Sequence, residues 1–285
     1  MTRAWQWWVL RCARLEDARA LALVRIGVSV AILLDLVRVG QLGLVDVLFR
    51  PYALGGLSSL QTQHVWIDAL PEGGRIAWIV AIGAFTLAAL GVGTRPAILM
   101  GTLAYAQLGH MYSPGDRAID RLLRTALLVL LFSGSHLRFS LLGKRADAVR
   151  AWPSDTLRLL LVIVYMTSGF AKLSSQPAWL ATNGTPVLYR LMADPLAGHL
   201  DPHAALAWFA PLRVLGWGTV ALELASPLIF TRWARFWAVG GICMHLGIAL
   251  TMHLGMFSWG MLALYPVVVG PWRRGQVLSS TTSPS

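Results

Sequence analysis

The stretch Leu157–Trp179, LRLLLVIVYMTSGFAKLSSQPAW, decides the fold class of this chain. It begins as an apolar run of helical length, becomes small and polar at Thr167, Ser168 and Gly169, and ends on Lys172. Apolar runs of about 20 residues are typical of helices that cross a membrane. A lysine at such a helix end either extends its amine into the interface, or lies just inside, where its charge is costly and indicates a function.

Similar apolar runs recur along the whole chain. Hydrophobic residues make up 56% of the 285 residues and charged residues 13%, against roughly a quarter charged in soluble domains. The sequence therefore predicts an all-α, polytopic integral membrane helical bundle of about eight transmembrane helices. The predicted spans are 20–37, 76–92, 96–110, 122–142, 157–171, 212–230, 236–252 and 255–269. Because the last two are separated by almost no polar loop, seven spans also fit.

Three parts are predicted along the chain. Residues 1–19 form a basic amphipathic segment, whose tryptophans and arginines suit a helix lying on the membrane surface. Residues 20–270 form one transmembrane domain. Residues 271–285 are rich in serine and threonine and are expected to be disordered.

The distribution of arginines predicts the orientation. With eight spans, most basic residues fall on the side that carries the N-terminus, the 135–156 loop and the tail. Positive loops stay in the cytoplasm, so both termini are expected to be cytoplasmic, and Lys172 faces outward. The net charge of +11 then indicates topology and contact with anionic lipids of the bilayer. Nucleic acid is not an expected partner.

Ionisable residues gather in the outer half of this arrangement, where a pocket is expected. Asp35 and Arg38 lie three apart on one helical face and are predicted to pair with each other. The run DRAIDRLLR, residues 116–124, is predicted to cap and pair at a helix start. The alternative is that Arg117 or a neighbouring arginine grips a ligand.

Glu223 and His245 are the ionisable groups expected near mid-membrane. A carboxylate at that depth needs a partner, and His245, on the following helix, is the predicted partner of Glu223. The alternative is that His245 is a hydrogen-bonded histidine of the helix core. No second histidine or carboxylate follows His245 at helical zinc-site spacing, and the two cysteines form no CxxC motif, so no metal is expected. Gly169 and Ala171 beside Lys172 are small and are predicted to allow close helix packing there. Lys172, kept dry among these residues, is predicted to act as a base. The 177–203 stretch is predicted to cover this face like a lid.

The segment YMTSGFAKLSSQPAW, residues 165–179, resembles the span-ending segment of vitamin K-dependent gamma-carboxylases, in which Tyr, Gly and Lys–Leu precede Trp in the same order. GMFSWGMLA, residues 255–263, is similar to the same family. LVRIGVSVAILLDLVR, residues 23–38, resembles the opening of the horizontally transferred transmembrane (HTTM) domain superfamily, which includes the carboxylases and the bacterial SdpB-like proteins of toxin-peptide systems. The resemblance covers most of residues 20–270.

The resemblance implies an enzyme that oxidises a reduced quinone, vitamin K hydroquinone or menaquinol, and modifies a peptide. The resemblance makes Lys172 the catalytic base. From their depth in the predicted arrangement, His245 and Glu223 are expected to support the pocket, and Arg38, His110 or Arg117 to orient the cofactor. The expected place is the bacterial cytoplasmic membrane, with the pocket on the extracytoplasmic side. The alternative is a non-catalytic SdpB-like component for maturation, export or immunity of a secreted peptide toxin. A transporter is a third reading, but no inverted repeat is evident.

Overall fold

The computed structural model describes residues 2–58, 72–143, 145–174 and 209–270, together with residues 188, 192, 198, 201 and 203. The chain divides into two compact units, one formed by residues 1–156 and 270–285 and the other by residues 157–269. The predicted 177–203 lid and 271–285 tail lie almost entirely outside the described residues.

The first unit is mainly helical. Its elements are α1 (Arg3–Ala13), β1 (Leu15–Asp17), α2 (Ala18–Gln41), α3 (Val45–Phe49), η1 (Tyr52–Leu54), α4 (Gly73–Leu90), α5 (Thr94–Met111), η2 (Ser113–Gly115), α6 (Ala118–Leu131), η3 (Ser135–Leu137) and β2 (Ala148–Arg150). β1 and β2 pair antiparallel, with Glu16 opposite Val149. This short pairing ties the entrance of α2 to the segment that precedes α7 (Trp152–Ser174), because the backbone N–H of Ala18 also donates to the Asp147 carbonyl at 3.0 Å.

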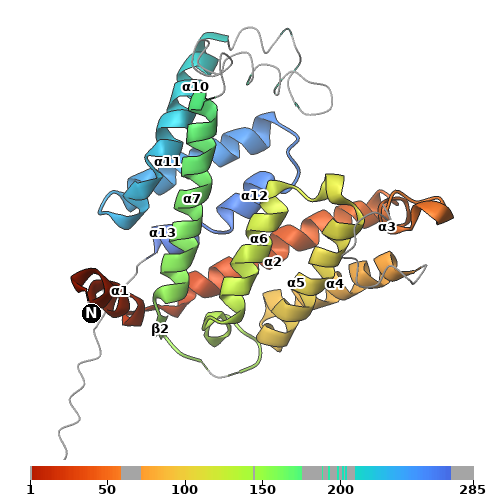
Figure 1. Ribbon diagram of the computed structural model, residues 1–285, viewed down its shortest axis with the longest axis horizontal. Coiled ribbons are helices and arrows are strands. Elements are labelled where there is room, and N and C mark those ends of the chain that lie inside the picture. Colours follow the sequence, from red (N-terminus) through yellow and green to blue (C-terminus); the bar gives the residue numbers. More distant parts are fainter. Residues whose placement is uncertain are drawn as a thin grey trace, which may run out of the picture. The chain divides into compact units, whose positions relative to one another are not determined.

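Helices α2, α4, α5 and α6 pack against one another around an apolar core (Figure 1). Phe85 on α4 and Leu123 on α6 are fully buried in it. Gly101 on α5 lets the Phe85 ring approach closely, since a Cβ at this position would lie 3.0 Å from the ring. Small residues at helix contacts are the usual means of close packing in membrane proteins.

The second unit contains most of α7, followed by α10 (Phe209–Leu224), η4 (Ser226–Phe230), α11 (Ala234–Thr251), α12 (Phe257–Leu262) and α13 (Pro266–Val269). The indole N–H of Trp237 on α11 donates to the Leu222 carbonyl on α10 at 2.8 Å. Arg158, near the start of α7, donates from Nε to the Val267 carbonyl on α13 at 2.7 Å. These two bonds connect the helices that carry the candidate site described below.

Four of the described helices are long and apolar enough to cross a membrane, namely α2, α4, α7 and α11. They coincide with four of the predicted spans, and the third predicted span, 96–110, is also one helix, α5. The all-α membrane architecture is therefore confirmed.

Three of the predicted spans do not continue as single helices. The helix predicted over 122–142 ends at Leu131, because the Ser133 hydroxyl donates to the Leu130 carbonyl at 2.8 Å and accepts from the Ser135 N–H at 3.1 Å, which turns the chain. α10 ends at Leu224, and the chain continues as η4 with Pro227 in its first turn. The last predicted span divides into α12 and α13, as expected where Pro266 begins a new helix.

Candidate functional site

Polar residues of the second unit share one face of α7. Tyr165, Ser168, Gly169 and Lys172 follow each other at the three- and four-residue spacing that places side chains on one side of a helix. Gly169 is the point of closest approach to α10, since a Cβ there would lie 2.9 Å from the Leu224 side chain. The predicted close packing at Gly169 is confirmed, and it brings α10 within reach of the polar face of α7.

Lys172 forms an ion pair with Glu223 of α10. Its Nζ lies 2.6 Å and 2.8 Å from the two carboxylate oxygens of Glu223, and 2.7 Å from the hydroxyl of Ser168 one turn earlier. The Lys172 side chain is 19% exposed and that of Glu223 is 7% exposed. Ser168 also donates to Glu223 Oε1 at 3.0 Å. The amine therefore lies neither in open solvent nor isolated in an apolar environment, but in a shared polar cluster.

His245 belongs to a different set of hydrogen bonds, so the predicted pairing of Glu223 with His245 is wrong. The Nε2 atom of His245 lies 2.6 Å from the Tyr165 hydroxyl, which is also 2.7 Å from the Tyr265 hydroxyl. His245 is 1% exposed, and its Nδ1 has no hydrogen-bond partner among the described residues. Trp237 stacks on the Tyr265 ring at a centroid distance of 5.7 Å, which holds this aromatic cluster together.

Tyr165→Phe should destabilise the protein by about 2 kcal/mol, because removing the hydroxyl leaves His245 and Tyr265 without their buried partner. Thermal unfolding of the purified protein in detergent would measure the change. The matched control is Tyr52→Phe, since Tyr52 is 75% exposed and its hydroxyl is solvated. Equal unfolding temperatures for the two variants would contradict a stabilising Tyr165 network.

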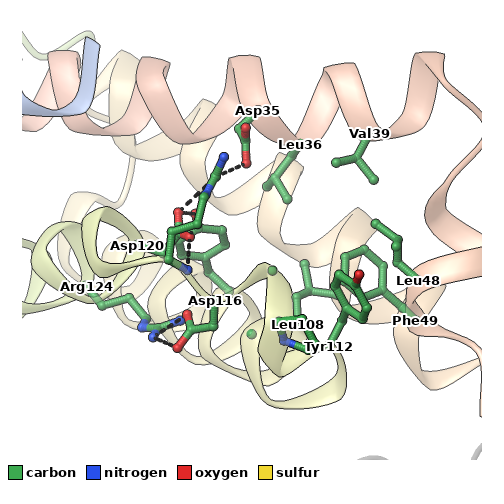
Figure 2. A pocket seen from close by; sticks show the side chains of 15 residues that line it. Asp35, Leu36, Val39, Leu48, Phe49, Leu108, Tyr112, Asp116, Asp120 and Arg124 are labelled. Carbon is green, nitrogen blue, oxygen red and sulfur yellow. Dashed lines mark hydrogen bonds and ion pairs between the residues drawn. The ribbon is translucent and has the colours of Figure 1, made fainter. Parts of the chain in front are cut away.

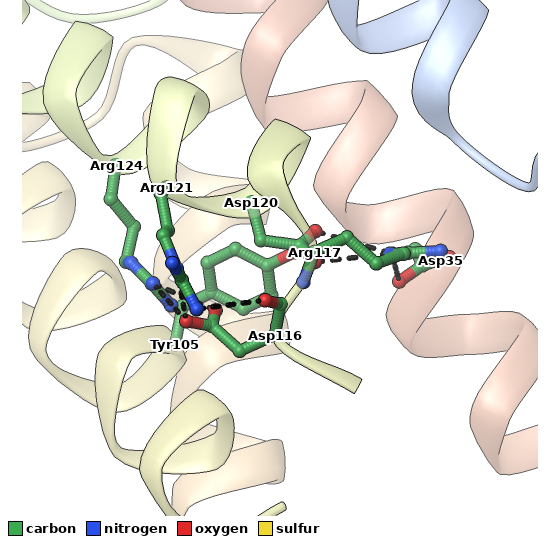
Figure 3. Close-up of polar contacts among 7 residues, drawn as sticks. All are labelled: Asp35, Tyr105, Asp116, Arg117, Asp120, Arg121 and Arg124. Atoms are coloured by element: carbon green, nitrogen blue, oxygen red, sulfur yellow. Dashed lines mark hydrogen bonds and ion pairs between the residues drawn. The ribbon is translucent and has the colours of Figure 1, made fainter. Parts of the chain in front are cut away.

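A second polar cluster lies in the first unit, where α6 begins (Figure 3). Asp120 Oδ2 accepts from the backbone N–H and the Nε of Arg117 at 2.8 Å and 3.0 Å, so the predicted capping role of this run is confirmed. Asp120 Oδ1 accepts from the Tyr105 hydroxyl at 2.6 Å. Asp116 pairs with both Arg121 and Arg124.

Arg117 also reaches helix α2, where its Nη2 donates to Asp35 Oδ2 at 2.7 Å. The predicted Asp35–Arg38 pair is therefore wrong: among the described residues the ion-pair partner of Asp35 is Arg117. Burial acts to lower the pKa of Arg117, but its contacts with Asp120 and Asp35 outweigh this and raise the pKa above its usual value. Arg117 thus stays charged and connects α6 with α2.

This cluster borders a cavity of about 240 Å³. Figure 2 shows its apolar side chains, among them Leu36, Val39, Leu48, Phe49, Leu108 and Tyr112, beside the charged residues. Of the three residues predicted to orient a cofactor, Arg117 lines this cavity, whereas Arg38 and His110 are exposed and do not contribute to its lining. Lys172, Glu223 and His245 belong to the second unit.

Several residues of these clusters were not predicted from the sequence to take part in a site. Ser168 lies four residues before Lys172, a spacing that would have indicated contact on a helix. Tyr105 and Tyr265 carry no such local signal, because their partners are distant in sequence. Lysine occurs only at positions 144 and 172, and the remaining 22 of the 24 lysine and arginine residues are arginines. The polar face of α7 thus carries a lysine where most cationic positions of the chain hold arginine.

The sequence profile of the HTTM domain family matches residues 13–272. No curated protein sequence and no solved structure matches the chain. The match covers both structural units and all the residues of the two polar clusters. Together with four described helices of membrane-spanning length and composition, it shows that the chain is an integral membrane protein belonging to the HTTM domain family.

Proposed function

We propose that the Lys172–Glu223 pair is a proton-transfer site acting on the hydroxyl of a lipid-soluble reduced quinone. The observation that carries this proposal is the placement of an amine, a carboxylate and the Ser168 hydroxyl within 3.0 Å of one another, next to apolar helix surfaces. Such pairs of titratable groups are typical of general acid–base sites. A reduced quinone supplies a phenolic hydroxyl that becomes reactive toward oxygen when it loses its proton.

The ion pair sets the order of proton movements. The Lys172 ammonium first passes a proton to Glu223 across the 2.6 Å contact, which leaves a neutral amine beside a neutral carboxylic acid. The amine can then accept one proton and become an ammonium again. Ser168 bonds to both groups and keeps them aligned. Glu223 is thus a proton store for the lysine. The sequence had indicated only a supporting role for Glu223.

The exposure of the two side chains fits this use. Lys172 is 19% exposed, so a ligand can reach its amine, whereas Glu223 is 7% exposed and less accessible. His245 would support the site indirectly, through Tyr165 on the same face of α7.

The finer proposal is a gamma-carboxylase-like, peptide-modifying enzyme of the bacterial cytoplasmic membrane, with the lysine on the extracytoplasmic side. This assignment rests on the resemblance of residues 165–179 and 255–263 to that family.

Oxygen consumption by the protein in lipid nanodiscs supplied with menaquinol tests the proposal. We expect Lys172→Arg to reduce the rate at least 100-fold, because arginine keeps the positive charge and the pairing with Glu223 but does not release its proton. The matched control is Lys144→Arg, the same change at the other lysine, which should leave the rate unchanged. Full activity of Lys172→Arg would exclude the amine as a base.

The alternative is a non-catalytic SdpB-like component that matures, exports or protects against a peptide toxin. It is favoured by the completeness of the ion pair, since Nζ directs bonds to Ser168 and to both oxygens of Glu223, as a purely structural link between helices would. In that case the wild-type protein consumes no oxygen with any quinol, and Lys172→Arg retains protection in cells that produce the peptide.

A further inference from the structure

The cavity of the first unit carries an inference that is independent of the lysine site. It lies where α2 and α5 end and α6 begins, with Asp35, Tyr105 and Arg117 among its lining residues. Figure 3 shows these three side chains. α2 is one of the helices that can cross a membrane, and the end of such a helix lies near the lipid head groups. A cavity at that depth is accessible to a polar head group whose tail stays in the bilayer.

The charged groups of the cavity are unequally satisfied. Asp120 accepts four hydrogen bonds from Arg117 and Tyr105, and Asp116 pairs with two arginines. Asp35 accepts only one, from Arg117 Nη2 to Oδ2, so its Oδ1 receives no hydrogen bond from any described residue. The Nη1 of Arg117 likewise donates to none of the described residues. Asp35 is 21% exposed and Arg117 38% exposed.

Asp116 Oδ1 also has no hydrogen-bond partner among the described residues, but it lies 2.7 Å from the cationic Nη2 of Arg124. The positions that define the ligand are therefore Asp35 Oδ1 and Arg117 Nη1. Asp35 Oδ1 can accept from a hydrogen-bond donor and Arg117 Nη1 can donate to an acceptor, and charged partners form hydrogen bonds roughly twice as strong as neutral ones. Three carboxylates and two guanidinium groups line the cavity, so a ligand with only negative charge is disfavoured. The volume of about 240 Å³ is below the 300–1,000 Å³ of pockets for drug-sized ligands, so it suits a head group rather than a whole lipid.

We propose that this cavity binds a zwitterionic group with a primary ammonium and a phosphate, the ammonium on Asp35 and the phosphate on Arg117. The apolar wall of Leu36, Val39 and Leu48 would face the first carbons beyond the head group. Two sources share this chemistry: an ethanolamine phospholipid of the bilayer and a soluble phosphoethanolamine.

Native mass spectrometry of the full chain in detergent, titrated with single phospholipids of identical acyl chains, tests the proposal. We expect ethanolamine phospholipid to bind at least tenfold more tightly than choline phospholipid, whose ammonium has the same charge but no N–H to donate to Asp35. Glycerol phospholipid, which has no ammonium, should bind as weakly. Equal binding of the three lipids would overturn the proposal.

Two variants and a control make the test specific to the cavity. Asp35→Asn should reduce ethanolamine-lipid affinity to the level of the choline lipid, and Leu48→Trp should abolish selectivity by filling the cavity without altering a charge. Asp46→Asn is the control, because Asp46 also pairs with an arginine, Arg75, but lies outside the cavity. Selectivity that survives both cavity variants would refute this location. Displacement of the lipid by free phosphoethanolamine at equal concentration would support the site and assign it to the soluble source.

Discussion

Replacing Lys172 by methionine should destabilise the protein by about 3 kcal/mol, more than replacing both members of the pair. The single change leaves the carboxylate of Glu223, 7% exposed, without its cation, and removing one partner of a buried ion pair costs roughly 3–5 kcal/mol. The double variant Lys172→Met/Glu223→Gln leaves no unpaired charge, so we expect it to recover more than half of the loss. Thermal unfolding in detergent, followed by intrinsic fluorescence, would measure both.

An exposed pair of the first unit provides the control for this comparison. Arg75 and Asp46 are 49% and 40% exposed, and their closest atoms are 2.6 Å apart, the same distance as Lys172 to Glu223. Because solvent screens such a pair, Arg75→Met should cost less than about 1 kcal/mol. If Lys172→Met costs no more than Arg75→Met, the pair is open to water, and Glu223 cannot serve as an enclosed proton store.

The features that the sequence predicted well depend on local pattern. Apolar runs of about 20 residues identified α2, α4, α7 and α11, since hydrophobic length is sufficient to recognise a spanning helix. The capping role of Asp120 was also predicted, because the helix dipole favours a carboxylate in the first turn, and its partner Arg117 is only three residues away. Likewise, Gly169 near Lys172 indicated a close helix contact, which the approach of Leu224 confirms.

The pairing of distant polar residues could not be predicted in the same way. Glu223 and His245 are expected at similar depth in neighbouring helices, but depth does not fix which way each side chain points around its helix. In the structure Glu223 points to α7, and His245 reaches the Tyr165 hydroxyl instead. Asp35 similarly has a candidate partner on its own helix, yet pairs with Arg117, 82 positions away. Helix rotation and packing decide such choices, and a single sequence contains neither.

The hydrogen-bond partners of Arg25 are also distant in sequence and could not be predicted, and its replacement should cause the second large loss of stability. Its side chain, in the first predicted span, is fully buried, and its guanidinium donates to the Ser135 carbonyl at 2.9 Å, the Phe139 carbonyl at 2.6 Å and the Ser140 hydroxyl at 2.7 Å. Arg25→Met should therefore destabilise the protein by about 4 kcal/mol, since hydrogen bonds to a charged group contribute about 1.5–3 kcal/mol each and the carbonyl groups lose their partner. Thermal unfolding in detergent would again measure this.

Phe139 explains why the turn after α6 needs this arginine. Among the described residues, Phe139 is the non-glycine residue that has a positive φ, 49°. This conformation costs an L-residue roughly 1–2 kcal/mol. The hydrogen bond from Arg25 to the Phe139 carbonyl holds the backbone in it. Loss of Arg25 should accordingly expose Arg138 to limited trypsin cleavage, whereas Phe139→Gly, which removes the backbone strain, should slow cleavage in the Arg25→Met background. Arg75→Met, which breaks the exposed Arg75–Asp46 ion pair, is the control. If it unfolds at the same temperature as Arg25→Met, the buried guanidinium does not stabilise the turn, and its burial has another cause.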